Sequence, residues 1–325
     1  MTDRIQLFER RNRRRIIPLL LLAILNYMVA VALAAVAIGL GVVLWAVFEG
    51  GVFPDDVGGV RVFSVGIVAI VVVSTVIGVL VGLVRIPFAR KSLERRVLRE
   101  TNAKLSEPDE NKEVRDLLEG LAIASGVPVP RFAVIEDPAP NSFGVGTKPS
   151  QTVIGITTGL SELLSRDELE AILAYEVSRI RSWDVALSSW AVALTSSAIS
   201  AVEADDDHIV RTLLGIVPRR LAVWLQVWAL RDQGEQRDLI AVHFTRNPLS
   251  LVRALEKLDV DAHPTRYVSR ATAPLWLEFP AGTLGAHPSR MARRLSRELL
   301  LDERIDRLRT LAGLPPRRDG EPRLM

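Results

Sequence analysis

The chain has no cysteine among its 325 residues. This absence excludes disulfides, thiolate metal sites and a cysteine nucleophile, and it agrees with a reducing compartment. Histidine is also scarce, because His208, His243, His263 and His287 are the only four and each is isolated in sequence. A lone histidine is more often a packed or surface residue than a metal ligand. The chain therefore has few of the side chains from which transition-metal sites are built.

Charge is absent from two long stretches near the N-terminus, residues 16–48 and 63–84. Each stretch is long enough to cross a bilayer core of about 30 Å as a helix. A cleavable signal peptide is the alternative for the first stretch, but the apolar run is far longer than a signal-peptide core and a second span follows it. The sequence therefore predicts an integral membrane protein anchored through residues 1–90.

The orientation follows from the basic residues that flank these stretches. RRNRRR (10–15) precedes the first span and RIPFARKSLERR (85–96) follows the second, whereas the loop EGGVFPDD (49–56) is acidic. We therefore expect a protein of the bacterial inner membrane whose N-terminus and main domain are cytoplasmic. A nucleic-acid patch is the alternative for RRNRRR, but no aromatic residues are interleaved and a membrane helix adjoins it, so no nucleic-acid partner is expected.

Residues 91–325 are predicted to form a compact, mostly helical domain with a small sheet. It begins with a linker from residue 91, and Ser165 with Glu168 fits the S-x-x-E capping box of a helix start. The predicted elements are a helix ending at Gly126, strands FAVI (132–135) and TVIGIT (152–157), a helix after Ser165, and helices at 251–258 and 299–313.

Two weaker apolar segments interrupt this domain, at 185–202 and 209–230. The first is near the minimum length for a membrane span. The second carries Arg219 and Arg220 in its middle, where each arginine costs about 2.5 to 3.5 kcal/mol at the bilayer centre. A second membrane hairpin and a buried helical pair both remain open, and we assign 185–230 as a hydrophobic hairpin inserted into the domain.

The central question concerns YEVSR (175–179), within LSRDELEAILAYEVSRIRSWD. In zinc proteases, H-E-x-x-H on a helix places two imidazoles on one zinc ion, and the glutamate acts as general base on the metal-bound water. Here Tyr175 and Arg179 occupy the histidine positions and only Glu176 is retained. Taken alone, YEVSR would be an ordinary helical turn.

The flanking sequence resembles the HtpX-type membrane zinc metallopeptidases. That family has a G-[IV]-P-x-P-x-x-x-V opening, a P-N-A-F-A-x-G loop, a T-x-G-L-L-x-L-L step and an H-E-[LI]-x-H-[IV]-x-x-x-D helix in this order. GVPVPRFAV, PNSFGVG, TTGLSELL and YEVSRIRSWD stand here in the same order. FTRNPLSLVRALEKL, AHPSR and DERIDRL extend the likeness over nearly the whole chain. The resemblance implies an α+β, mostly helical fold: a transmembrane helix pair, then a zincin-like metallopeptidase domain.

The family's third zinc ligand is a glutamate in E-x-x-A-D, just before the T-x-N-P stretch. An ungapped alignment on TRNP places Gly234 at that glutamate and Asp238 at the aspartate. Arginine has no lone pair and keeps its charge, and Tyr175 could bind a metal only as a phenolate, against a reference pKa of about 10. Because a zinc site needs three protein ligands, we expect no zinc here, although the family uses it.

The resemblance also implies roles for residues around this helix. Asn141, Phe143 and Gly146 belong to the family's P-N-x-F loop. Ile154 and Ile156 lie on TVIGIT, which corresponds to the edge strand along which substrate chains add.

Asp184 and Asp238 stand close to the former ligand positions in the motifs. We expect Asp184 to make a plain structural hydrogen bond. Glu176 and Arg179 are i,i+3 neighbours that could form a charge pair in the vacated pocket, with Arg179 pointing to solvent as the open alternative.

Three functions remain open. The first is a catalytically inactive pseudopeptidase that binds unfolded or membrane polypeptides, or an active protease paralogue, in protein quality control. The second is an active metalloendopeptidase with substituted zinc ligands and Glu176 as general base. The third is a structural membrane scaffold, because function depends on the site and here the site is altered.

Overall fold

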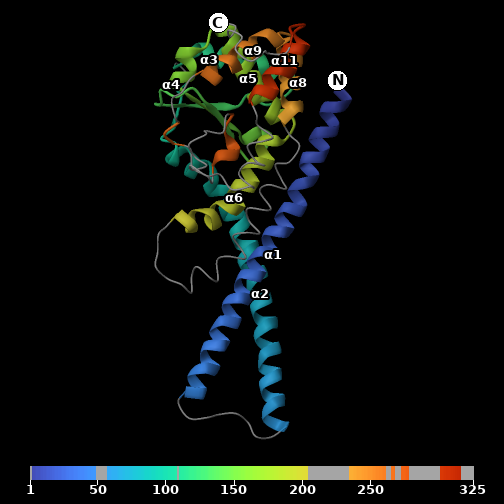
Figure 1. Cartoon of the computed structure of the whole chain (residues 1–325), viewed down its shortest axis with the longest axis vertical. Helices are drawn as coiled ribbons and strands as arrows, with labels where there is room; N and C mark the ends of the chain where they lie inside the picture. The colour runs from blue at the N-terminus through green and yellow to red at the C-terminus, as the bar shows by residue number, and fades with distance from the viewer. Residues whose placement is uncertain are drawn as a thin grey trace. The chain divides into compact units, whose positions relative to one another are not determined.

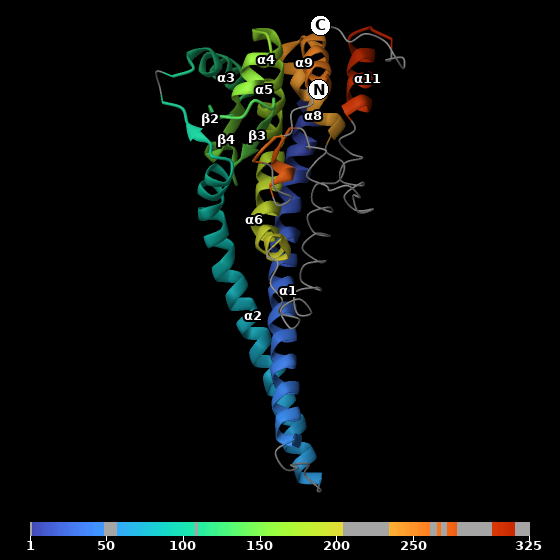
Figure 2. The same cartoon turned by 60° about the vertical axis from the view of Figure 1, so that its left-hand side comes forward.

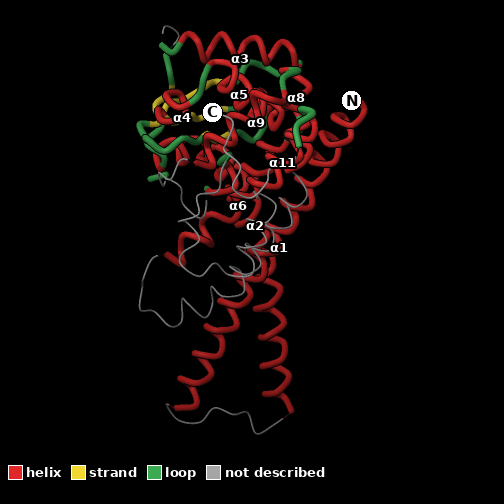
Figure 3. Tube along the Cα trace, turned by 45° about the horizontal axis from the view of Figure 1, so that its top comes forward, coloured by secondary structure: helices red, strands yellow, loops and turns green. Residues whose placement is uncertain are grey.

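The computed structural model describes residues 2–48, 57–107, 110–203, 234–260, 265–267, 272–277 and 301–315. The chain divides into two compact units. The first comprises Met1–Ile16, Arg90–Ala193 and Gln226–Met325, and the second comprises Ile17–Ala89 and Leu194–Leu225. Figure 3 shows that helices predominate, with the described strands gathered in one small sheet. This confirms the predicted α+β, mostly helical class.

The two apolar N-terminal stretches form the long helices α1 (Thr2–Phe48) and α2 (Val57–Glu100). Segments of both, Ile5–Gly39 and Ala69–Glu100, are long and apolar enough to cross a membrane. Gly78 allows the two helices to approach closely, because a Cβ there would lie only 2.6 Å from the Met28 Cα. The two apolar helices predicted from the sequence are therefore present.

Residues 91–100, expected to begin a linker, are helical, because α2 continues without a break to Glu100. The end of the helix has no glycine or proline, and Arg96 pairs with Glu100 at 2.6 Å across one turn. Such i,i+4 pairs support exposed helices. The sequence turns only at Thr101 and Asn102, before the first strand.

The sheet has the strand order β1-β2-β4-β3, from β1 (Lys104–Leu105), β2 (Arg131–Ile135), β4 (Val153–Thr157) and β3 (Ser142–Val145). β4 pairs in parallel with β2 and antiparallel with β3. Both predicted strands, FAVI and TVIGIT, are thus present as β2 and β4. The assignment of TVIGIT as the edge strand is wrong, because β4 lies between two strands and β3 forms the edge.

Helices cover this sheet and position the site (Figure 1). In chain order they are α3 (Lys112–Ser125), α4 (Thr158–Leu163), α5 (Arg166–Arg181), α6 (Asp184–Glu203), α8 (Gly234–Thr245), α9 (Pro248–Val260) and α11 (Leu301–Leu311). α5 packs against α3, α8 and α9, and Figure 2 shows α8 and α9 close to it. The capping box of Ser165 and Glu168 is confirmed at its start.

α5 is buried on every side from Leu169 to Ile180, apart from the half-buried Glu170. Its apolar residues join the main core cluster with β4, α3 and α9. A helix buried in this way must satisfy its polar side chains within the protein, since a buried polar group without a partner is costly. The polar residues in the middle of α5 therefore define a site rather than a surface.

The predicted hairpin at 185–230 is described only in its first part. α6 covers its start as an apolar helix. Residues 204–233, which hold the second apolar segment, lie outside the described residues. The assignment of the hairpin as an insertion stays a prediction.

Candidate functional site

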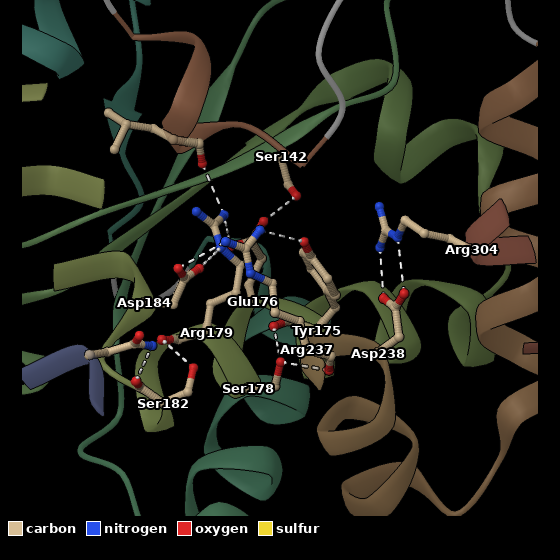
Figure 4. A network of polar contacts seen from close by, with 12 residues as sticks. Ser142, Tyr175, Glu176, Ser178, Arg179, Ser182, Asp184, Arg237, Asp238 and Arg304 are labelled. Atoms are coloured by element: carbon tan, nitrogen blue, oxygen red, sulfur yellow. Dashed lines mark hydrogen bonds and ion pairs between the residues drawn. The ribbon is translucent and has the colours of Figure 1, made fainter. Parts of the chain in front are cut away.

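Tyr175, Glu176 and Arg179 lie on consecutive turns of α5 and are all buried, with Glu176 and Arg179 at 0% exposure. Figure 4 shows these side chains converging with residues from β3, α6, α8 and α11. A charged side chain with no access to water requires partners of opposite charge or strong hydrogen bonds. The structure supplies both around Arg179.

The Arg179 guanidinium is held between two carboxylates. Its Nη1 donates to Oε2 of Glu176 at 3.0 Å, and its Nε donates to Oδ2 of Asp184 at 2.9 Å. Burial alone would lower the pKa of Arg179, but the charges of Glu176 and Asp184 outweigh it and raise this pKa above its ordinary value. The predicted i,i+3 charge pair is therefore present, and the solvent-facing alternative is wrong.

The Glu176 carboxylate is engaged at both oxygens. While Oε2 accepts from Arg179, Oε1 accepts a hydrogen bond from Ser142 Oγ at 2.8 Å. Gly144 leaves room for this arrangement, because a Cβ there would lie 3.2 Å from Glu176 Oε2 and 2.9 Å from Val185 Cγ2. The carboxylate thus links α5 to β3 through Ser142 and pairs with Arg179 within α5 itself.

Asp184, the first residue of α6, bridges two guanidinium groups. Its Oδ2 accepts from Arg179 and its Oδ1 accepts from Arg237 Nη2 at 2.9 Å. Burial opposes the charge of Arg237, but the Asp184 carboxylate dominates and the pKa of Arg237 is raised. Asp184 thus makes structural hydrogen bonds, as expected, but it makes two and both are ion pairs with arginines.

α8 contributes further charged residues around Tyr175. Gly234 is its first residue, and Arg237 follows one turn later, with Nη1 3.4 Å from the Tyr175 hydroxyl oxygen. Asp238 accepts two bonds from Arg304 of α11, at 3.0 and 2.8 Å, and the Arg304 guanidinium lies 4.9 Å from the centre of the Tyr175 ring. Two arginines, Arg237 and Arg304, thus lie against the Tyr175 side chain.

Sequence reasoning missed Arg237 and Ser142, although both have a signal in the motifs. In the ungapped alignment Arg237 stands at the alanine of E-x-x-A-D, and Ser142 stands at the first alanine of P-N-A-F-A-x-G. Each change adds a hydrogen-bonding group where the family has a methyl. Because the two positions are 95 residues apart, only the structure shows that both contact α5, Ser142 at Glu176 and Arg237 at Tyr175.

The residues at this site do not fit a zinc ion. The carboxylates of Glu176 and Asp184 already bind guanidinium groups, and arginine offers no lone pair to a metal. Among the described residues, no group of three or more His, Cys, Asp or Glu side chains could hold a metal ion. A dication would also be repelled by Arg179 and Arg237 at close range.

The predicted loop residues lie on or beside β3, next to Ser142, and the predicted strand residues lie on the neighbouring β4. The Asn141 backbone N–H donates to Thr157 Oγ1 at 2.8 Å, and a Cβ at Gly146 would lie 2.5 Å from the Gln151 carbonyl oxygen. Phe143 is buried in β3. Two further residues were predicted to line a substrate edge. Those residues, Ile154 and Ile156, instead belong to the main core cluster.

Comparison with known proteins gives a consistent family. The description "Peptidase family M48" matches residues 108–297, which include α5 and the site around it. A "Protease HtpX homolog" of Dictyoglomus turgidum is 30% identical over 212 residues, covering 60% of this chain and 68% of that protein. A protein of the same name from Streptococcus gordonii is 30% identical over 232 residues, covering 62% and 74%. One from Dictyoglomus thermophilum is 29% identical over 240 residues, covering 69% and 77%.

Proposed function

Because this chain belongs to peptidase family M48, as an HtpX-like member, we propose that it is a membrane-anchored pseudopeptidase that binds polypeptide without hydrolysing it. The observation that supports this proposal is the buried guanidinium of Arg179 between Glu176 and Asp184. It stands where the resemblance places the second zinc-binding histidine. The tyrosine and glycine at the other two ligand positions, Tyr175 and Gly234, add no strong donor.

Hydrolysis by a zinc peptidase requires a metal that lowers the pKa of its bound water, with a carboxylate as general base. A guanidinium has no coordination position for water, so it cannot supply this step. It can donate hydrogen bonds to a peptide carbonyl, and Nη1 of Arg179 does so to the Leu275 carbonyl oxygen at 3.0 Å. Arg179 therefore supports recognition of a peptide backbone in the absence of a hydrolytic step.

One observation favours an active metalloendopeptidase instead, which is the retention of Glu176. Glutamate also forms helices well, so its presence in α5 needs no catalytic cause. In this structure both of its oxygens accept hydrogen bonds, from Arg179 and Ser142. We therefore assign Glu176 as the partner of Arg179 and a vestige of the general base.

We place the protein in the bacterial inner membrane, with its N-terminus and main domain in the cytoplasm. The two apolar helices and the basic residues that flank them support this orientation. The ligands we propose are unfolded or membrane polypeptides, or an active protease paralogue, in protein quality control. Binding by strand addition needs no metal.

The test is metal content by mass spectrometry on the detergent-purified full chain, together with casein hydrolysis and retention of unfolded casein. We expect no stoichiometric zinc and no cleavage, together with casein retention by the parent protein. Stoichiometric zinc with cleavage that Glu176→Gln abolishes would establish the active enzyme. If the protein retains neither casein nor a membrane protease, the remaining hypothesis is that it is a structural membrane scaffold.

A further inference from the structure

A short segment of the same chain is paired with the outer edge of β3. Trp276 forms an antiparallel bridge with Phe143, and the Leu277 N–H donates to the Ser142 carbonyl oxygen at 2.7 Å. This side of β3 is the one that β4 leaves open. The segment comprises the 3-10 turn Ala273–Leu275 and the two residues after it, and all but the half-buried Pro274 are buried.

The same segment reaches the centre of the site. The Leu275 carbonyl oxygen accepts the 3.0 Å hydrogen bond from Arg179 Nη1. An extended peptide can be held by main-chain pairing to an edge strand, and a cation that donates to one of its carbonyls adds a second contact. Residues 273–277 make both contacts within one chain.

Two buried polar atoms lie at this junction without a hydrogen-bond partner among the described residues, Arg179 Nη2 and Trp276 Nε1. An unsatisfied buried donor destabilises the arrangement that buries it. The docked segment is therefore held less firmly than a fully satisfied core element. Such a contact is suited to exchange with another peptide that can use the spare donor of Arg179.

We propose that residues 273–277 are an internal ligand of this site, paired with β3 and anchored to Arg179 through the Leu275 carbonyl, and that a polypeptide binds only when this segment is displaced. This inference rests on the proposed polypeptide-binding function. It adds two features to that function, an arginine as the carbonyl anchor and a competing segment of the chain itself.

The internal ligand also indicates the chemistry of the external one. Trp276 packs against Phe143 with ring centres 5.1 Å apart. Gly155 leaves room for the Phe143 ring, since a Cβ there would lie 2.2 Å from Phe143 Cε1. We therefore expect an extended, apolar and uncharged segment with an aromatic residue next to the residue whose carbonyl binds Arg179.

The decisive experiment locks the segment in place in the full-length protein. Ser142 and Leu277 are the hydrogen-bonded neighbours of the bridge, and cysteines there would have a Cα separation of about 5.5 Å, within the disulfide range. The chain has no cysteine of its own, so Ser142→Cys with Leu277→Cys gives one defined bond. The probe is a fluorescein-labelled peptide TAPLWL, the sequence of residues 272–277. Binding is followed by fluorescence anisotropy in detergent.

We expect the oxidised double variant to bind this peptide at least about tenfold more weakly than the same protein after reduction. The disulfide removes the fraction of molecules in which residues 273–277 are displaced from β3, and only these molecules bind the peptide. The single variants control for the reductant and should not respond to it. A disulfide that forms without changing peptide affinity would overturn the inference. So would failure of the cysteines to cross-link in a folded protein, since the segment would not then lie against β3.

Leu277→Pro is the second test. If the double variant does not fold, this variant decides whether residues 273–277 compete with the peptide. It removes the N–H that bonds to Ser142, so the segment should dock less and the peptide should bind about fivefold more tightly. Unchanged affinity would count against the inference. Casein separates the two proposals: casein retention with unaltered peptide affinity overturns only the internal ligand, whereas loss of all polypeptide binding overturns the proposed function and this inference together.

Discussion

At the scale of single residues, Arg179 places one positive charge where a relative with H-E-x-x-H would bind a dication. The charge is balanced within the chain by Glu176 and Asp184, and Asp184 is shared with Arg237. Removing one partner of such a buried set leaves an uncompensated charge, which typically costs about 3 to 5 kcal/mol. The four side chains are therefore a unit, and single substitutions among them are expected to affect folding before function.

Replacing both arginines of this unit together with the residues at the other two ligand positions gives a prediction about zinc binding. Tyr175→His, Arg179→His, Gly234→Glu and Arg237→Ala together restore the donors of H-E-x-x-H and E-x-x-A-D. We expect this variant to hold about one zinc ion per chain after gel filtration, because three protein ligands then meet and the nearby guanidinium is gone. Zinc is measured by mass spectrometry, and circular dichroism confirms the fold.

The matched control for this conversion keeps Arg237. In the parent, this guanidinium approaches the Tyr175 hydroxyl oxygen to 3.4 Å, so it would face the new zinc site. We expect the control to retain clearly less zinc than the full conversion. If the full conversion binds no more zinc than the parent protein, the ligand positions assigned here, above all Gly234, are wrong.

At the scale of elements, the start of α5 is fixed by one carboxylate with two tasks. Glu168 Oε2 accepts from the Ser165 N–H at 2.8 Å, closing the capping box, and from Lys257 Nζ of α9 at 2.7 Å. Burial alone would raise the pKa of Glu168, but the bonds from Lys257 and Ser165 lower it below its ordinary value. The helix that carries the site is thus tied to α9 by a charge that acid removes.

This arrangement predicts an acid-sensitive contribution to stability. Because the pKa of Glu168 is lowered in the folded state, the contribution is full above about pH 4.5, the ordinary value, and is lost as the pH falls through the lower folded value. Glu168→Gln should lower the free energy of unfolding by about 1 kcal/mol at neutral pH. The difference from the parent should shrink as the pH falls below that value.

Chemical unfolding in detergent at a series of pH values measures this effect. Glu170→Gln makes the same change of charge two residues further along α5 and serves as the control. Its unfolding should follow the pH dependence of the parent. An unaltered acid profile in Glu168→Gln would show that the capping carboxylate is not the titrating group.

Local patterns predicted the elements well where the signal is local. The capping box at Ser165, the β-branched run of β4 and the apolar spacing of α9 each depend on neighbouring residues. β3 was missed because its four residues lie in a loop-like Pro/Asn/Gly stretch and become a strand only by pairing with β4. The wrong edge assignment of β4 has the same cause, since pairing partners distant in sequence leave no periodic signal.

The site shows the same limit. Tyr175, Glu176 and Arg179 could be singled out because they occupy a known motif on one helix. Ser142, Arg237 and the Leu275 carbonyl come from three other segments, and no spacing rule connects them to α5. The sequence shows that Ser142 and Arg237 replace alanines of the family motifs. It does not show that both side chains contact the residues of the site.

At the scale of the whole molecule, the chain combines an apolar unit with a unit that carries the sheet and the site. In the apolar unit, α1 and α2 expose large hydrophobic side chains, which a lipid environment would accept and water would not. The basic clusters that flank the two helices predict which side of the membrane each part faces.

Labelling of introduced cysteines tests this orientation without background, because the parent has none. Gly51→Cys lies in the acidic loop between the spans, and Ile123→Cys replaces a residue of α3 that is 83% exposed. A membrane-impermeant maleimide should label the first in intact cells and the second only after permeabilisation. The reverse pattern would contradict the cytoplasmic assignment of the main domain.

The cation at the centre of the site is covalently part of the chain. A metal ion exchanges with the medium, so the occupancy of its site follows the supply of that ion and the presence of chelators. Arg179 has no such exchange, and its guanidinium stays protonated at every physiological pH. The site therefore holds its positive charge as soon as the chain folds. A cell starved of metal holds it in the same charge state as a cell that is replete.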